Sequence, residues 1–397
     1  MSSAHMLLGD IVRPAATRRA GNEDLPILSM TMRGGLVDQA DKFKKRVASA
    51  DTSAYRVVDR GQLVVGFPID EGVLSFQRLY DSVIVSPAYE IWDLVDPGLV
   101  SRDYLERFLR SPRALRYYSA KLQGSTARRR SLPRDVFLAL PVPLPPLGEQ
   151  ERIASVLDQV DTLRTKRRQA VSLLGDLAQS VFLDMFGDPA RNPLGWPVGK
   201  VGDLLVSANY GSSAKADTEG DVPVLRMNNV TASGEVDMRD LKYLPMGQVS
   251  EKHLVRTGDV LFNRTNSAEL VGKTAIYRLV EEVAYAGYLV RLRVNEENHP
   301  EYLAAFLNSR YAKRMLRSMS KSIVGMANIN AKEVQGMEIP APPLAEQKRF
   351  AAAITQVEAA KAPHRAHLAT LDELFTSLQY RAFSGAFWDH GAPGEVA

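Results

Sequence analysis

The stretch PPLGEQERI occupies residues 145–153, and a close copy, PPLAEQKRF, occupies residues 342–350, an offset of 197. At the same offset, LGDL at 174–177 returns as LDEL at 371–374. Solenoid repeats recur about every 20–50 residues, whereas this period is close to half of the 397 residues. The repeat therefore predicts two homologous halves.

Each half has the same internal order. Short apolar runs among turn residues come first, such as QLVVGF at 62–67 and DVLF at 259–262, and they indicate strands. A helical stretch then begins at Tyr104 or Tyr302, and a proline-rich stop and a long helix follow. This order predicts an α+β fold. The predicted segments are a first domain at 1–140, a helix at 141–188, a second domain at 189–339 and a second helix at 340–397.

The clearest pattern in the sequence is the apolar stripe of the first long helix. The stripe consists of Val156, Val160, Leu163, Ala170, Leu174, Leu177 and Val181. Its spacing alternates between four and three residues, which is the heptad seam of a helix that packs against a partner helix. Arg167 is the one polar seam residue, and FGDP at 186–189 ends the helix. About 33 residues at about 1.5 Å each predict a rod on the order of 50 Å long.

The second long helix carries a comparable stripe, interrupted by a proline. Its apolar residues are Phe350, Ile354, Val357, Ala360, Leu368, Leu371, Leu374 and Leu378. Pro363 lies between them, at the position that corresponds to Lys166 in the first copy. A proline inside a helix costs about 3 kcal/mol and kinks or breaks it. We therefore expect two helical pieces that meet near Pro363.

Two interpretations of these stripes are open. Each helix packs on the core of its own domain, or the two helices bury their seams against each other. The presence of a stripe at matching places in both halves favours the second interpretation. Helices that each follow their own domain most simply lie antiparallel. We therefore expect an antiparallel coiled coil that separates the two domains in a pseudo-twofold arrangement.

The overall composition is that of an ordinary globular protein. Hydrophobic residues make up 45% and charged residues 24%, and the formal net charge is +4. No run of eighteen or more apolar residues is present, so we expect no membrane span. Cysteine is absent, which excludes disulfides, thiolate metal sites and cysteine nucleophiles. This absence fits a reducing cytoplasm, where we expect the protein to act.

Basic residues gather at the same place in both halves. Residues 101–134 contain ten Lys and Arg against two acids, and residues 302–335 contain six against one. An excess of one sign in both halves predicts phosphate binding, although a simple charged surface is the alternative. The candidate phosphate-binding residues are Lys121, Arg128, Arg129, Arg130, Lys313, Arg314 and Lys321.

The loops after the basic helices differ between the halves, GSTARRR at 124–130 against GMANIN at 325–330. Arginine binds guanine through two hydrogen bonds in the major groove, and asparagine binds adenine in the same way. Two domains that bind different half-sites are expected to carry different side chains on a shared backbone frame. Loops that diverged without any role in recognition would show the same difference. The candidate base-reading residues are Arg129, Arg264, Asn328 and Asn330.

Patterns typical of catalysis are incomplete. GKT at 272–274 resembles the end of a phosphate-binding loop, but Ser267 stands where that loop needs a glycine. His364 and His367 have the spacing of metal ligands on a helix, and no third ligand is evident nearby. NPLG at 192–195 lacks the second proline and the aromatic ring of an amino-methyltransferase motif. We therefore expect no catalytic site and no metal site.

These residues together resemble the specificity subunit of type I restriction–modification systems. PPLGEQERI, LLGDL at 173–177 and FLDMFGDP at 182–189 look like the central conserved region of that family. PPLAEQKRF looks like its distal counterpart. The likeness spans nearly the whole chain, and the paired blocks are quite specific to the family.

The resemblance implies a function as well as a fold. It implies two target-recognition domains that bind the two halves of a split double-stranded DNA target, held apart by the coiled coil. Two methyltransferase subunits would dock on the helices, so the seam residues are also candidates for partner docking. An ATP-dependent restriction subunit can join such an assembly. The chain itself would be non-catalytic and bind no cofactor, and S-adenosylmethionine would be bound by the partner, which methylates adenine at N6.

Two other classes of function stay open from the residues alone. One is a stand-alone nuclease or methyltransferase with a divergent site, against which the missing motifs argue. The other is a coiled-coil scaffold with no role in nucleic-acid binding, against which the paired basic stretches argue.

Overall fold

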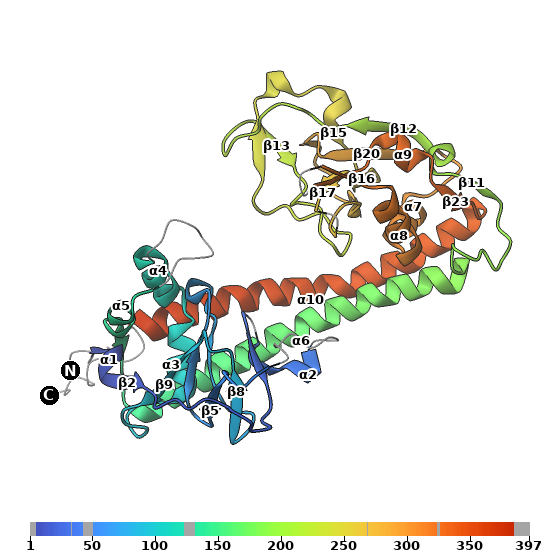
Figure 1. Cartoon of the computed structure of the whole chain (residues 1–397). Coiled ribbons are helices and arrows are strands. Elements are labelled where there is room, and N and C mark those ends of the chain that lie inside the picture. Colours follow the sequence, from blue (N-terminus) through green and yellow to red (C-terminus); the bar gives the residue numbers. More distant parts are fainter. Residues whose placement is uncertain are drawn as a thin grey trace. The chain divides into compact units, whose positions relative to one another are not determined.

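The computed structural model describes residues 5–32, 34–42, 51–122, 132–267, 269–323 and 326–384. The chain forms two compact units. Unit 1 comprises residues 1–166 and 368–397, and unit 2 comprises residues 167–367. Two long helices, α6 (Leu147–Phe186) and α10 (Leu344–Ser384), each contribute one part to unit 1 and the other part to unit 2 (Figure 1).

Unit 1 is an α+β domain built around the four-stranded sheet β2-β9-β6-β7. Two further antiparallel pairs, β3–β4 and β5–β8, accompany it. Its strands are β1 (His5–Leu7), β2 (Val12–Pro14), β3 (Leu28–Thr31), β4 (Gly35–Asp38), β5 (Arg56–Asp59), β6 (Leu63–Val65), β7 (Leu74–Phe76), β8 (Ser82–Val85), β9 (Glu90–Leu94) and β10 (Pro141–Pro143). Its shorter helices are α1 (Leu8–Ile11), α2 (Gln39–Lys42), η1 (Ile69–Glu71), α3 (Arg102–Leu109), α4 (Pro112–Lys121) and α5 (Arg134–Leu138).

Unit 2 contains two four-stranded sheets, β12-β20-β16-β18 and β14-β13-β19-β15, and the three-stranded sheet β17-β22-β21. Its strands are β11 (Val198–Lys200), β12 (Leu205–Tyr210), β13 (Val222–Leu225), β14 (Lys242–Leu244), β15 (Leu254–Val255), β16 (Val260–Asn263), β17 (Thr265–Asn266), β18 (Thr274–Ile276), β19 (Val283–Tyr285), β20 (Leu289–Val294), β21 (Lys321–Ile323), β22 (Met326–Asn328) and β23 (Glu338–Pro340). Its shorter helices are η3 (Val201–Leu204), η4 (Met246–Gln248), η5 (Glu251–His253), α7 (Pro300–Asn308), α8 (Arg310–Met319) and α9 (Ala331–Gln335).

The repeated PPLxEQ block has the same structural role in both units. The glutamine side chains, Gln150 and Gln347, are almost completely buried. In unit 1, Gln150 Oε1 accepts a hydrogen bond from the backbone N of Ser101 at 2.9 Å. In unit 2, Gln347 Oε1 accepts one from the backbone N of His299 at 2.8 Å. Each long helix is therefore joined at its start to the first turn of α3 or α7 by one buried amide.

Each long helix also ends in an aromatic core. In unit 2, the ring of Phe186 at the end of α6 lies 4.9 Å from that of Tyr302. In unit 1, the ring of Phe383 near the end of α10 lies 5.7 Å from that of Tyr104. Phe186 and Phe383 are separated by 197 residues, so they are counterparts in the repeat. The structure thus confirms an α+β fold with two equivalent halves.

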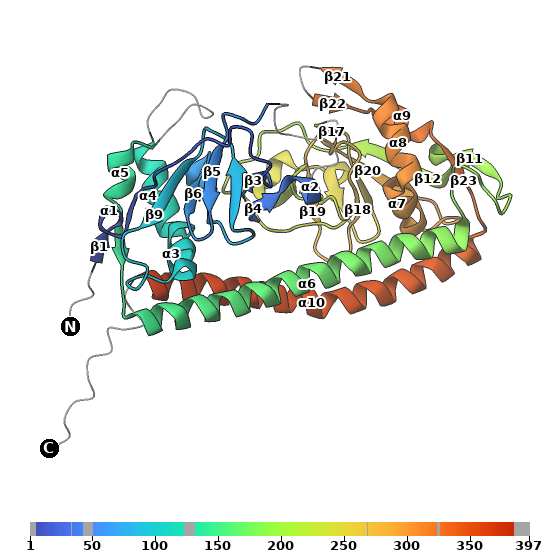
Figure 2. The ribbon, with the colours of Figure 1, turned by 60° about the horizontal axis from the view of Figure 1, so that its bottom comes forward.

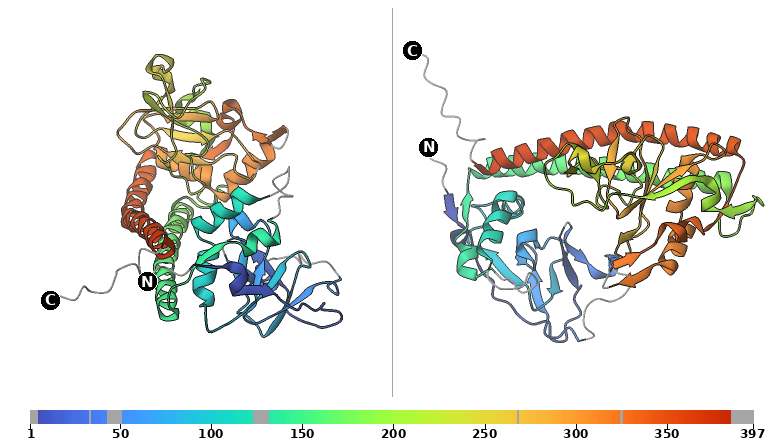
Figure 3. Two further views of the ribbon diagram at one scale, coloured as in Figure 1. Left: turned by 90° about the vertical axis from the view of Figure 1, so that its left-hand side faces the viewer. Right: turned by 90° about the horizontal axis from the view of Figure 1, so that it is seen from above.

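Within each unit, α6 and α10 lie side by side and antiparallel (Figures 2 and 3). In unit 1, the Arg164 guanidinium donates to Asp372 at 2.6 Å and stacks over Phe375 at 4.2 Å. In unit 2, Arg167 Nη1 and His364 Nδ1 are 3.2 Å apart. These two residues are themselves counterparts in the repeat. The antiparallel pair of helices is confirmed, and its polar seam position contacts the equivalent position of the other helix.

The register of the seam on α6 differs from the predicted one. The column Val160, Arg167, Leu174 and Val181 is buried or half-buried as expected. Val156, Leu163 and Leu177, however, are 39%, 44% and 47% exposed. Ile153 extends the buried column toward the start of the helix, and the second column lies one residue later than predicted and consists of Leu157, Arg164, Val171 and Ala178. The prediction was wrong for these three of its seven apolar residues, whereas Ala170 is half-buried; the error arose because apolar residues flank the shared column on both sides.

The seam on α10 repeats that of α6 at the offset of 197. Phe350, Ile354 and Val357 are buried, and Leu371 and Leu378 are half-buried, as predicted. Ala360 and Leu374 are exposed, and the residues that follow them, Lys361 and Phe375, take their places. Lys361 is only 4% exposed, and its ammonium bonds the Glu358 carboxylate at 2.8 Å. A buried charge is tolerated at this seam position because a carboxylate pairs with it.

The prediction of a broken second helix was wrong. α10 is a single helix of 41 residues that contains Pro363. Proline removes one backbone hydrogen bond, here to the carbonyl group of Ala359, and strains one turn. Contacts directly after this turn and across it hold the helix: His364 contacts Arg167, and Arg365 binds Glu235 and, across the turn, Glu358. This packing offsets the local cost of the proline.

Replacing Pro363 with alanine is therefore expected to stabilise the protein. Pro363 is exposed, and alanine restores the N–H group without disturbing a packed side chain. We expect unit 2 to gain about 1–3 kcal/mol in the free energy of unfolding, measured by denaturant titration. Pro300→Ala is the matched control, because Pro300 occupies the first turn of α7, where proline is favourable. Equal effects of the two substitutions would contradict the expectation.

No helix in the described part of the chain has the length and apolar character needed to cross a membrane.

Candidate nucleic-acid interface

Helix α8 presents a face of three arginines. Ser309 caps its start by accepting a hydrogen bond from the backbone N of Ala312 at 3.1 Å. The Ala312 and Leu316 side chains anchor the helix in the core of unit 2. Arg310, Arg314 and Arg317 are exposed and recur at positions i, i+4 and i+7, so they share one face. The helix has no acidic residue, and none of the three arginines pairs with a carboxylate of another described residue. Such a row of uncompensated cations suits a phosphate backbone.

Lys313 lies on the other side of α8. Its Nζ donates to the carbonyl oxygen of Gly272 and, at 2.9 Å, to Oδ1 of Asn308. Burial lowers the pKa of Lys313 to about 8, and the neighbouring charges of Arg317 and Lys273 act in the same direction. The ammonium is therefore bonded within unit 2, and the phosphate contact predicted for Lys313 stays a prediction.

A small sheet brings together other candidate residues of unit 2. In Figure 2, the sheet β17-β22-β21 lies at the end of this unit that is opposite α6 and α10. Lys321 in β21 pairs with Asn328 in β22 through the backbone. Asn328 Oδ1 accepts a hydrogen bond from Arg264 Nη2 at 2.9 Å. Two candidate base-reading residues, Arg264 and Asn328, are thus in direct contact.

Asn330 has a structural role next to this sheet. Its Oδ1 accepts from the backbone N of Glu333 at 2.9 Å, and its own N donates to Oε2 of Glu333 at 2.8 Å. These two bonds form a capping box at the start of α9. Asn330 also lines an open cavity of about 520 Å³ together with Tyr210 and Lys332. Its predicted contact with a base stays a prediction.

In unit 1, many of the basic residues are used inside the protein. Arg107 donates to Asp158 on α6 at 2.8 Å, and Arg102 donates to the carbonyl oxygen of Gly61 at 3.2 Å. Arg110, Arg113 and Arg134 bond Met32, Phe383 and Glu90, respectively. The count of ten basic residues in this stretch therefore overestimated the number of cations that can bind phosphate, because half of them bond other parts of the domain.

The remaining basic candidates of unit 1 form a smaller set. Arg116 and Lys121 on α4 are exposed. The ammonium of Lys121 lies 5.3 Å from the centre of the Tyr117 ring. Arg128, Arg129 and Arg130 lie outside the described residues. Arg116 is the counterpart of Arg314 at an offset of 198, so both units place an exposed arginine at this position.

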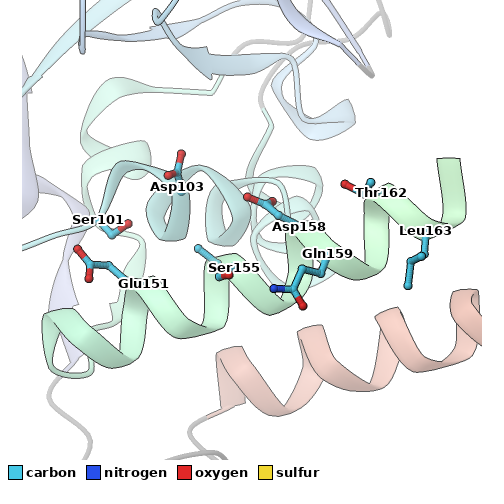
Figure 4. Close-up of a pocket in the computed structure, with 9 residues that line it drawn as sticks. Ser101, Asp103, Glu151, Ser155, Asp158, Gln159, Thr162 and Leu163 are labelled. Carbon is cyan, nitrogen blue, oxygen red and sulfur yellow. The ribbon is translucent and has the colours of Figure 1, made fainter. Parts of the chain in front are cut away.

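An acidic groove of about 780 Å³ lies along α6 in unit 1 (Figure 4). Asp103 from α3 and Glu151 and Asp158 from α6 line it, and the exposed Leu163 lies at its far end (Figure 4). Carboxylates repel phosphate, so this groove does not suit nucleic acid. It suits a basic or partly apolar protein segment better.

The motifs considered for catalysis have ordinary places in the fold. In GKT, Thr274 begins strand β18, whereas a phosphate-binding loop leads into a helix. The ammonium of Lys273 donates to the carbonyl oxygen of Met227 at 2.8 Å. Among the described residues, no group of three or more His, Asp or Glu side chains could hold a metal ion.

The comparisons with known proteins agree with this picture. Residues 193–372 match the family described as the type I restriction modification DNA specificity domain. The chain is also 29% identical to the EcoKI specificity subunit of Escherichia coli K12 over 266 residues, 62% of this chain and 57% of that protein. The chain is thus similar to type I specificity subunits, and residues 193–372 match their DNA specificity domain.

Other specificity subunits are similar to this chain as well. A putative MjaX specificity subunit of Methanocaldococcus jannaschii is 27% identical over 203 residues, 50% of this chain and 48% of that protein. The matched regions thus span about half of these relatives' own length. A crystal structure of the type I S subunit from M. genitalium aligns over 96% of both chains, with a TM-score of 0.53 and 12% identity. At this identity, the structural likeness supports the fold alone.

Some residues of the interface were missed by the sequence reasoning. Arg310 and Arg317 were counted in the basic stretch but not selected, although their spacing of three and four residues from Arg314 was a usable signal. Tyr210 was also missed, and its ring lies 4.9 Å from the Arg264 guanidinium. No sequence pattern points to Tyr210, because strand pairing brings it to residues far along the chain.

Proposed function

We propose that this chain recognises a split double-stranded DNA target as the specificity subunit of a type I restriction–modification complex. The observation that carries the proposal is the duplication: the same α+β plan occurs twice, and each copy is joined to the start of one long helix, α6 or α10, by an equivalent buried glutamine. Two equivalent domains with different loops suit two different half-sites. The similarity of the chain to type I specificity subunits, and the exposed arginines Arg116 and Arg314 at equivalent positions, support this function.

The proposed partners are two methyltransferase subunits, which ATP-dependent restriction subunits can join. The relative from E. coli is named as the specificity subunit of a type I restriction enzyme. Val156, Leu163 and Leu177 are exposed on α6 and lie seven and fourteen residues apart, so they share one face of the helix. We assign them to partner docking, where the association with a methyltransferase removes them from water.

In this proposal the chain positions its partners and carries out no chemistry. S-adenosylmethionine is bound by the methyltransferase subunit, which transfers the methyl group to N6 of adenine. The described part of this chain offers no cluster of metal ligands, and the phosphate-loop-like segment leads into a strand. The proposed complex acts on DNA, and this agrees with the cytoplasmic location that we expect from a sequence without cysteine.

The test is to map N6-methyladenine in the genome of a bacterial host that carries the cognate methyltransferase, with and without this chain. We expect a split methylated motif that is present only when both proteins are made. A methyltransferase co-expressed with the chain that lacks residues 193–372 is the control. If the intact proteins co-purify and no new motif appears, and the purified complex also fails to prefer any genomic fragment, the proposed function is wrong.

A further inference from the structure

Arg264 lies between β17 and the end of β16, and its backbone is held on both sides. Its N donates to the carbonyl oxygen of Tyr288 at 3.0 Å, and its carbonyl oxygen accepts from the N of Ile329 at 2.9 Å. The Cα atom of Arg264 therefore has little freedom, and the direction of its side chain follows from the sheet. A residue that reads a base needs this kind of support.

The guanidinium of Arg264 is also oriented by two side chains. Its Cζ lies 4.9 Å from the centre of the Tyr210 ring, and its Nη2 donates to Asn328 Oδ1 at 2.9 Å. Tyr210 is itself fixed, because its hydroxyl accepts from the backbone N of Ala331 at 2.9 Å. Tyr210 lies in β12, Asn328 lies in β22, and Arg264 directly precedes β17, so residues from three separate parts of the chain form this cluster.

Arg264 differs from comparable arginines in unit 2 because no carboxylate of a described residue pairs with its charge. Arg226, Arg291, Arg293 and Arg365 are buried or half-buried, and each faces an aspartate or a glutamate. Half-buried Arg264 forms no ion pair with another described residue. Its Nε is buried without a hydrogen-bond partner, as are those of Arg226, Arg291 and Arg365, so the missing carboxylate is what sets Arg264 apart. Holding a partly desolvated cation without an anion costs free energy. An external group with acceptor atoms would satisfy it.

We propose that Arg264 reads a guanine in one half of the DNA target, with Tyr210 and Asn328 as its positioning residues; this inference rests on the proposed function. The O6 and N7 atoms of guanine accept two hydrogen bonds from one guanidinium in the major groove. A phosphate also accepts hydrogen bonds from arginine, but α8 already offers a row of exposed arginines for contacts with the DNA backbone. A single planar guanidinium that is stacked on a ring and bonded to an amide is suited to the major-groove edge of one base.

The decisive variant is Arg264→Lys. Lysine keeps the positive charge that a phosphate contact needs, but it cannot reproduce the planar pair of donors. The measurement is the Kd of the complete complex for its own target and for targets in which each guanine is replaced in turn. The wild-type complex is expected to prefer guanine at one position by about 10- to 100-fold. In R264K this ratio falls close to one, while the preferences in the other half-site are unchanged.

Variants of Asn328 test the positioning role without removing the arginine. N328A removes the acceptor that orients Nη2, so the preference for guanine decreases. N328D keeps an acceptor at this place, so the preference is retained. R314A is the control for comparison, because the loss of a contact with the DNA backbone weakens binding to every DNA fragment alike. These variants also keep the inference testable if R264K folds poorly.

The outcomes separate this inference from the function on which it rests. If the wild-type complex binds no DNA with sequence preference, the proposed function fails. If it binds its target specifically and R264K retains every base preference, or loses affinity equally for all fragments, only the assignment of a guanine to Arg264 fails.

Discussion

Replacing Arg310, Arg314 and Arg317 together with alanine is expected to weaken DNA binding by about a hundredfold or more. Three charge-assisted contacts at about 1 kcal/mol each amount to about 3 kcal/mol, and each 1.4 kcal/mol is about tenfold in Kd. The three contacts lie on one face of α8, so the substitutions leave the buried Ala312 and Leu316 in place. Fluorescence anisotropy on the target, at several salt concentrations, measures the effect.

The salt dependence gives a second and independent readout. Each lost phosphate contact lowers the slope of log K against log salt concentration by about 0.9, so the triple variant is expected to lose about 2.7. The matched control replaces Arg152, Arg239 and Arg349, which are exposed and pair with neighbouring carboxylates. It changes the net charge by the same amount. If both triple variants lose affinity equally, the effect comes from net charge and not from the face of α8.

Replacing Leu157 with alanine is expected to lower the free energy of unfolding by about 2–5 kcal/mol. Leu157 is 1% exposed and packs in the core of unit 1, which includes Phe383 of α10. The loss combines the lost burial of the side chain with the cavity that remains. Denaturant-induced unfolding followed by circular dichroism measures it.

Leu163→Ala is the matched control for this prediction, because it changes the same residue type on the same helix. Leu163 is 44% exposed, so its loss is expected to cost less than about 1 kcal/mol. The pair of variants also tests the register of the seam. A larger effect at Leu163 than at Leu157 would support the seam that the sequence alone indicated.

Much of the architecture was predictable because it depends on patterns that are local or repeated. The copies of PPLxEQ located both long helices, and the stop at residues 186–189 was correct: α6 ends at Phe186, and Gly187 has a φ of 77°. The first helix is longer than expected, 40 residues, because Pro145 and Pro146 directly precede its first turn. Proline in that place starts a helix without losing a hydrogen bond.

The candidate interface was less predictable because the number of charged residues in a segment does not tell which of their side chains reach the surface. Arg107 and Arg314 belong to equivalent basic stretches, yet Arg107 pairs with Asp158 on α6 and Arg314 is exposed without a carboxylate partner among the described residues. Asp158 lies 51 residues farther along the chain. No pattern around Arg107 indicates this contact, so the excess of positive charge was assigned to phosphate as a whole.

The sequence alone established the duplication, the two α+β halves and the two long helices, and it indicated the family that the conserved blocks resemble. These features depend on composition, on repeats and on periodicity, which are properties of short segments. The tertiary structure decided which half of the seam faces the partner helix, whether Pro363 breaks α10, and which arginines remain exposed. Each of these depends on free energies of packing and pairing between residues far apart in the chain, and those contacts exist only when the chain is folded.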